Sequence, residues 1–154
     1  MSEQPTAAYF TAIPRSPQLR ASELYDQLGD KTPAGQRLTM SEPAFSYYPR
    51  LQRLRDFVES DVSHHISLRD AARVAAYETT YFCAWFHKRV GIRFMEWLTL
   101  VRICKATELM RSRDYAIWEV AKAAGFQSVR AFERAFKRVT GLSPREYKML
   151  ARPS

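Results

Sequence analysis

One pattern of aromatic residues and glycine occurs twice in the chain, 50 residues apart. Each copy has two Phe residues four positions apart and a Gly five positions later: Phe82, Phe86 and Gly91, then Phe132, Phe136 and Gly141. Residues four positions apart lie on one face of an α-helix, and a Gly after them can end the helix with a positive φ. The in-frame repetition, each time after a short Ala-rich stretch, indicates two copies of one helical unit.

The second copy lies within residues 116–147, which have the outline of a helix-turn-helix followed by a supporting helix. Apolar residues at three- and four-residue steps predict a short helix that Gly125 ends. Ser128 can cap the next helix, because its hydroxyl can accept a hydrogen bond from a first-turn amide. Ser143, followed by a Pro, predicts the start of the last helix.

The longer helix predicted after Ser128 has two different faces. Its inward stripe is apolar, and its outward stripe contains Arg130, Glu133, Arg134 and Lys137. Such a helix suits insertion into a DNA major groove, with Arg reading guanine and Lys contacting phosphate. A solvated charged face on an ordinary helix is the alternative for this stretch alone. The repeat upstream favours the first interpretation, since a lone solvated helix would not be duplicated in frame.

The distribution of proline and charge predicts the domain organisation. Six of eight Pro residues lie at or before Pro49, and the 94 residues from Arg50 to Ser143 contain none. Residues 1–46 carry a net charge of −1, whereas residues 47–154 carry +9. We therefore expect an N-terminal arm and linker over 1–46, with one short helix over about 17–28, and a basic all-α domain over 47–154. The basic domain favours a polyanionic partner, most often nucleic acid.

Periodicity predicts about seven helices in this domain, over residues 47–65, 67–75, 79–90, 94–111, 117–124, 128–140 and from 143 onward. Ser67 and Asp70 resemble a capping box at the start of the second. The long helix over 94–111 would join the two units and span about 27 Å. Recognition helices about 34 Å apart can enter successive major grooves on one face of DNA.

Other chemistry has little support in the sequence. Cys83 and His87 share a helix face, but two ligands do not make a structural zinc site, and a catalytic thiol needs a base and a pocket. Cys104 is expected to be a small buried residue, and His64-His65 to lie at a helix end. We predict no cofactor, no metal and no membrane span, since no stretch approaches about 18 apolar residues. A signal peptide is not recognisable either, which predicts a cytoplasmic, nucleoid-associated protein.

Residues 125–148, GFQSVRAFERAFKRVTGLSPREYK, closely resemble the signature of the AraC/XylS family of bacterial transcription regulators. The resemblance extends over about 47–149 and includes the first unit and the joining helix. It implies a double helix-turn-helix domain that binds double-stranded DNA and activates by recruiting RNA polymerase, with repression also open. The chain resembles the short stand-alone members, which are typically regulated by their amount or by partners, so that no small-molecule effector is implied.

The resemblance also places base contacts on the outer face of each second helix. These positions are Arg130, Ala131, Glu133 and Arg134 in the second unit, and Thr80, Cys83 and Ala84 in the first. We assign phosphate contacts to six further residues, namely Ser128, Lys137, Arg138, His87, Lys88 and Arg89.

The first unit departs from the family pattern. Ala76 occupies the place of the usual turn Gly, and Glu78 that of the usual capping Ser, with Thr79 as a substitute cap. A Glu at a helix N-terminus suits the helix dipole but repels an approaching phosphate. The outward side chains of this helix are small until His87. We therefore expect the first unit to read thymine methyls and DNA shape, or to bind weakly.

Two functions from different classes follow. The first is a sequence-specific DNA-binding regulator with Arg130 and Arg134 as the main base readers. The alternative is a protein-interaction module that binds a regulator or RNA polymerase and has weak or lost DNA binding. An enzyme is not expected, because the chain lacks a catalytic portion.

Overall fold

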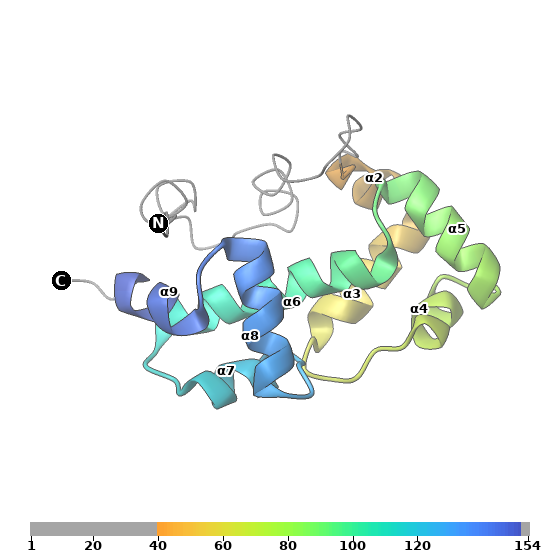
Figure 1. The fold of residues 1–154 in the computed structure, drawn as a ribbon. Helices are drawn as coiled ribbons and strands as arrows, with labels where there is room; N and C mark the ends of the chain where they lie inside the picture. The colour runs from red at the N-terminus through yellow and green to blue at the C-terminus, as the bar shows by residue number, and fades with distance from the viewer. Residues whose placement is uncertain (1–39, 152–154) are drawn as a thin grey trace.

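The computed structural model describes residues 40–151, in which helices follow one another throughout (Figure 1). These residues form eight helices and no strand, which confirms the all-α class. The helices are α2 (Glu42–Tyr47), α3 (Pro49–Ser60), α4 (Leu68–Val74), α5 (Thr79–Val90), α6 (Phe94–Ser112), α7 (Ile117–Ala123), α8 (Val129–Thr140) and α9 (Pro144–Ala151). The helix predicted over 17–28 lies outside the described residues.

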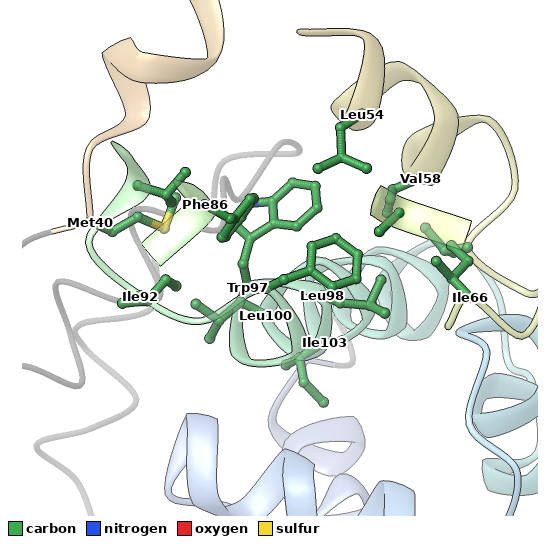
Figure 2. Close-up of a cluster of buried hydrophobic side chains, with 14 of the residues drawn as sticks. Met40, Leu54, Val58, Ile66, Phe86, Ile92, Trp97, Leu98, Leu100 and Ile103 are labelled. Atoms are coloured by element: carbon green, nitrogen blue, oxygen red, sulfur yellow. The ribbon is translucent and has the colours of Figure 1, made fainter. Parts of the chain in front are cut away.

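The longest helix, α6, lies between the two units and contacts both (Figure 1). It packs against α5 on one side and against α7, α8 and α9 on the other. In Figure 2, Trp97 lies toward Phe86 of α5 and Leu54 of α3, whereas Ile103 points the opposite way. A helix that buries apolar side chains on more than one face must be covered on more than one face. The predicted joining helix is therefore present as the shared core of both units.

Both copies of the repeated pattern adopt the same local structure. The two Phe rings of each copy are buried and in contact, with centroids 5.8 Å apart for Phe82 and Phe86 and 5.5 Å apart for Phe132 and Phe136. Each following Gly ends its helix in the left-handed region, with φ of 93° in the first copy and 79° in the second. The predicted duplication is confirmed.

The duplication extends into a third helix of each unit. Trp97 in the first turn of α6 lies with its ring centroid 5.8 Å from Phe86. Tyr147 of α9, 50 residues later, lies 5.4 Å from Phe136. Both aromatic residues are buried, with exposed fractions of 1%. The start of α6 and the whole of α9 thus play the same part, each covering the inner face of a recognition helix.

The turns between the two helices of each unit also correspond. Ala76 and Gly125 both have left-handed backbone conformations, with φ of 58° and 87°. In the first turn the Tyr77 amide donates to the Ala72 carbonyl at 2.9 Å. In the second turn the Phe126 amide donates to the Ala121 carbonyl at 3.0 Å. The second turn is one residue longer than the first, because Gln127 stands before the capping Ser128.

Residues 42–46, predicted to be part of a linker, instead belong to α2, and the segment from Met40 onward packs on the first unit. Phe45 is 1% exposed and stacks on Trp97 with ring centroids 5.0 Å apart. The guanidinium of Arg55 lies 4.2 Å from the centroid of the same Phe45 ring. The Ser41 amide donates to the Val90 carbonyl at 2.8 Å, which ties this segment to the end of α5. A helix of six residues is too short to show the periodicity on which the sequence prediction depends.

The helix expected to end near His64-His65 ends at Ser60 instead. Asp61 stops it, because its carboxylate accepts hydrogen bonds from the Ser63 amide at 3.0 Å and from the Ser63 hydroxyl. This is a local side-chain-to-backbone turn that competes with the helix. Both His residues therefore lie in the loop between α3 and α4 and not at a helix end.

The two turns should respond differently to substitution. A Cβ on Gly125 would lie 2.0 Å from the Val62 carbonyl oxygen, in addition to the strain of a positive φ. We expect Gly125→Ala to lower the free energy of unfolding by about 3 kcal/mol or more. Ala76→Gly should change it by less than about 1 kcal/mol, since relief of strain offsets the greater freedom of the unfolded chain. Urea denaturation followed by circular dichroism measures both, and similar small changes would contradict this assignment.

Candidate nucleic-acid interface

The outer face of α8 gathers cationic side chains around a shallow depression. The lining residues are Arg130, Glu133, Arg134, Lys137 and Arg138 of α8 and Ser143, which precedes α9. The depression is open and has a volume of about 490 Å³. All four cations are exposed, while Phe132, Phe136 and Val139 on the opposite side of α8 are buried. The predicted outward stripe is therefore present as a basic surface held in place by an apolar one.

The start of α8 is capped as predicted. Ser128 accepts a hydrogen bond from the Ala131 amide through its Oγ, at 3.1 Å. Ser128 is exposed, and Ala131 is half-buried beneath the outer face. The first turn of α8 thus combines a neutral cap with the exposed Arg130, so that an anionic group can approach the N-terminus of the helix without meeting a carboxylate there.

The start of α5 has the opposite electrostatic character. Glu78 is itself the cap, and its carboxylate accepts hydrogen bonds from the amides of Thr80 at 3.0 Å and Tyr81 at 3.1 Å. These backbone bonds hold the pKa of Glu78 below its ordinary value, that from Thr80 being the larger cause. Glu78 is exposed and ionised, so a negative charge stands where the second unit has the Ser128 hydroxyl.

Five of the six residues predicted to contact DNA in the first unit share one face of α5, and Arg89 lies on a different face. Thr80 and Ala84 are exposed and Cys83 is half-buried between them, while His87, Lys88 and Arg89 lie exposed in the last turn. Arg89 is engaged with the segment that precedes the unit: it donates to the Tyr48 hydroxyl at 3.0 Å, and its guanidinium lies 4.9 Å from the Tyr48 ring centroid.

Tyr81 is a surface residue of α5 that the sequence prediction did not include. Its side chain is 57% exposed, and its ring lies 4.9 Å from that of Tyr77. Tyr77 in turn lies 4.9 Å from Trp85 and beneath the guanidinium of Arg50, at 4.3 Å. The repeat contains the missing signal: Tyr81 stands 50 residues before Ala131, which was assigned to the reading face of the second unit.

Neither Cys83 nor Cys104, the two cysteines of the chain, takes part in a disulfide, and both are half-buried. Within residues 40–151, no group of three or more His, Cys, Asp or Glu residues is placed to hold a metal ion. Nor does any helix of this part of the chain have the length and apolar character needed to cross a membrane.

Comparison with known proteins gives a consistent result for this region. A family profile described as a helix-turn-helix domain matches residues 71–149, just over half of the chain. YkgA of Escherichia coli K12, named as an HTH-type transcriptional regulator, is 31% identical over 98 residues, which are 64% of this chain and 41% of YkgA. The HTH-type transcriptional activator AarP of Providencia stuartii is 27% identical over 93 residues, which are 60% of this chain and 69% of AarP. The chain spans about two fifths of the length of YkgA and of three similar regulators.

Two solved structures show the same arrangement of helices. The C-terminal domain of AraT, a response regulator from Geobacillus stearothermophilus, has a TM-score of 0.65 and 29% identity, and covers 70% of this chain and 89% of that domain. The DNA-binding domain of AdpA, solved in complex with a target DNA, has a TM-score of 0.63 and 25% identity, covering 66% of this chain and 91% of the AdpA domain.

The cap at Glu78 should make stability depend on pH. The pKa of Glu78 is lower in the folded chain than its ordinary value of 4.5 in the unfolded chain. Its contribution to stability is therefore complete above pH 4.5 and is lost as the pH falls through the folded value. Glu78→Gln should therefore be less stable than the unaltered chain near neutral pH, and the difference should shrink on acidification. Urea denaturation between about pH 7 and pH 3 measures it. Asp56→Asn, which removes an exposed charge from α3, is the control, and a Glu78→Gln difference that persists unchanged in acid would contradict the assignment.

Proposed function

The chain belongs to the AraC/XylS family of transcriptional regulators and contains its helix-turn-helix DNA-binding domain, and we propose that it binds double-stranded DNA sequence-specifically by placing α5 and α8 in adjacent major grooves. The matched family consists of DNA-binding regulators and not enzymes, as expected.

The basic outer face of α8 is the observation that carries this proposal. Arg130 and Arg134 stand one turn apart on a helix whose inner face is fixed by buried aromatic rings, so both guanidinium groups project to the same side. A guanidinium can donate two hydrogen bonds to the O6 and N7 of guanine. Lys137 and Arg138 in the last turn, together with Ser128 at the cap, are suited to phosphate contacts.

The first unit is proposed to read a different kind of base-pair edge. Thr80, Cys83 and Ala84 are short and nearly apolar, which suits contact with thymine methyl groups. Tyr81 adds a ring that can pack on such a methyl and a hydroxyl that can donate to a phosphate or a base. Glu78 keeps phosphate away from the start of α5, so the phosphate contacts of this unit fall to His87, Lys88 and Arg89 in its last turn.

Activation by recruitment of RNA polymerase is the proposed consequence for transcription. It is supported by the family likeness and by AarP, which is named a transcriptional activator and of which the matched region covers 69%. Action in the cytoplasm at the bacterial nucleoid follows from the same proposal.

A titration of selected and random DNA at several salt concentrations tests the proposal against the alternative of a protein-interaction module. DNA fragments selected from a random library by the full chain supply the specific site. Specific DNA binding requires a steep fall of affinity with salt and an excess affinity for the selected site of at least about a thousandfold. Equal, weak affinity for both DNAs would instead favour the protein-interaction module.

Arg134 and Lys137 should have separable effects on this binding. Arg134→Ala should cost about 1–3 kcal/mol on the selected site and relax the preference at one base position. Lys137→Ala should weaken binding to all sequences alike and reduce the slope of log affinity against log salt by about 1. Competition titrations with single-base variants of the site distinguish the two, and equal loss on random DNA for Arg134→Ala would mean that Arg134 contacts only phosphate.

Tyr81 offers a corresponding test of the first unit. Tyr81→Ala should cost about 1–3 kcal/mol on the selected site and relax the preference at a base position in the half bound by α5. Tyr81→Phe retains that preference if the ring contacts a thymine methyl and loses it if the hydroxyl donates to a base. Tyr47→Ala, at a tyrosine on α2 that is 77% exposed, is the matched control and should leave the base preferences unchanged.

A further inference from the structure

We propose that α3 and the loop after it, residues 61–66, form a brace that sets the orientation of one helix-turn-helix unit relative to the other, with Arg102 and Gln127 as positioning residues. The significance for DNA reading depends on the function proposed above, whereas the orientation itself does not. The brace makes its contacts through Arg50 at the start of α3 and through the 61–66 loop at its end.

The two ends of the brace hold the two turns. At the start of α3, Arg50 Nη1 donates to the carbonyls of Ala75 at 2.8 Å and Ala76 at 3.0 Å, in the turn of the first unit. At the other end, the 61–66 loop lies against the turn of the second unit, where a Cβ on Gly125 would meet the Val62 carbonyl oxygen at 2.0 Å. In Figure 1 this loop passes beside the connection from α7 to α8. One helix with its loop therefore contacts the corresponding turn of both units.

The 61–66 loop has a defined shape of its own. The Asp61 carboxylate accepts from the Ser63 amide at 3.0 Å and lies 2.5 Å from His64 Nδ1. The Ser63 hydroxyl is the main cause that keeps the pKa of Asp61 below its ordinary value. The side chains of Val62 and Ile66 are buried, at 8% and 3% exposed, so both ends of the loop are anchored in the core. A loop fixed in this way can transmit position and is not merely a tether.

Two side chains of the second half of the chain reach the loop. Arg102 of α6 donates from Nη2 to the His64 carbonyl at 3.3 Å, while its Nε is buried without a hydrogen-bond partner. Gln127 Nε2 lies 2.9 Å from His65 Nδ1, a contact between residues 62 positions apart. Gln127 is the additional residue of the second turn, which the first turn lacks. The longer turn thus supplies a side chain for which the first unit has no counterpart.

A second attachment matters because α6, although it forms part of the core of both units, can bend between them. Long helices bend gently, and two bodies joined along one helix can tilt about it. The contact of the loop with Gly125, Gln127 and Arg102 joins the units at another point, and two separate attachments restrict tilt as one does not. Since each recognition helix must enter its own groove, the angle between the units determines which half-site spacing is accepted.

Residual dipolar couplings of the full-length protein in weakly aligning medium test this without DNA. The unaltered chain should give one alignment tensor for α4–α5 and α7–α9. Gln127→Ala combined with Arg102→Met should give two different tensors. Arg102→Met keeps an apolar stem and removes the buried, unpartnered Nε, so the fold should be retained, as circular dichroism verifies. Gln52→Ala, at an exposed glutamine on α3, is the matched control and should keep one tensor.

One common tensor in the double variant, equal to that of the unaltered chain, would overturn the proposal. If the double variant proves unstable, Gln127→Ala alone, an exposed substitution, is judged by the same criterion. On DNA selected by the full chain, the double variant should lose on the order of tenfold affinity for the two-half-site fragment and tolerate altered spacing, with affinity for each single half-site unchanged. If the tensors separate but the unaltered chain shows no specific site, the brace stands and the proposed DNA function fails.

Discussion

Burial of the inner stripe of each recognition helix is the constraint on which the rest of the domain depends. Two Phe residues on the inner face of each recognition helix are fully buried: Phe82 and Phe86 of α5, and Phe132 and Phe136 of α8. An α-helix has a fixed angular relation between its residues, so fixing these rings fixes what points outward. Each pair also needs a third helix to cover it, which α6 and α9 supply through Trp97 and Tyr147. The buried rings of each unit therefore determine which side chains face solvent, although the rings themselves are not exposed.

The same core supports two dissimilar surfaces. A neutral Ser128 caps α8 and a carboxylate at Glu78 caps α5, yet both caps satisfy backbone amides of the first turn. Gly125 and Ala76 likewise both occupy the left-handed turn position. In the second unit the Val62 carbonyl lies so close to Gly125 that no side chain fits there, whereas the first unit accepts Ala76. The backbone requirement is common to the units, whereas the chemistry offered to a partner is free to differ.

Sequence reasoning succeeded where the signal is periodic or local. The joining helix and the caps at Ser67 and Ser143 depend on residues within a few positions of one another, the repeat is a periodic pattern that recurs in frame, and the structure has each of them. It failed at α2, which is too short for periodicity, and at the end of α3, where the Asp61 side chain competes with the helix. It also gave no indication of the contacts of Arg102 and Gln127 with the 61–66 loop. Hydrogen bonds that join residues 38 and 62 positions apart leave no spacing rule in a single sequence.

The placement of acidic residues explains how a domain with many carboxylates still offers a basic face. Four carboxylates have lowered pKa values, and hydrogen bonds from a Ser or Thr two or three positions away are the largest cause in each: Asp61, Asp70, Glu78 and Glu146. Three of them lie at the start of a helix, where negative charge is favoured by the helix dipole. The cations of α8 lie instead along the outer face and in the last turn. Three of these four carboxylates thus begin helices while the cations of α8 face outward, and two carboxylates still lie on the proposed reading surfaces: Glu133 among the cations of α8, and Glu78 at the start of α5.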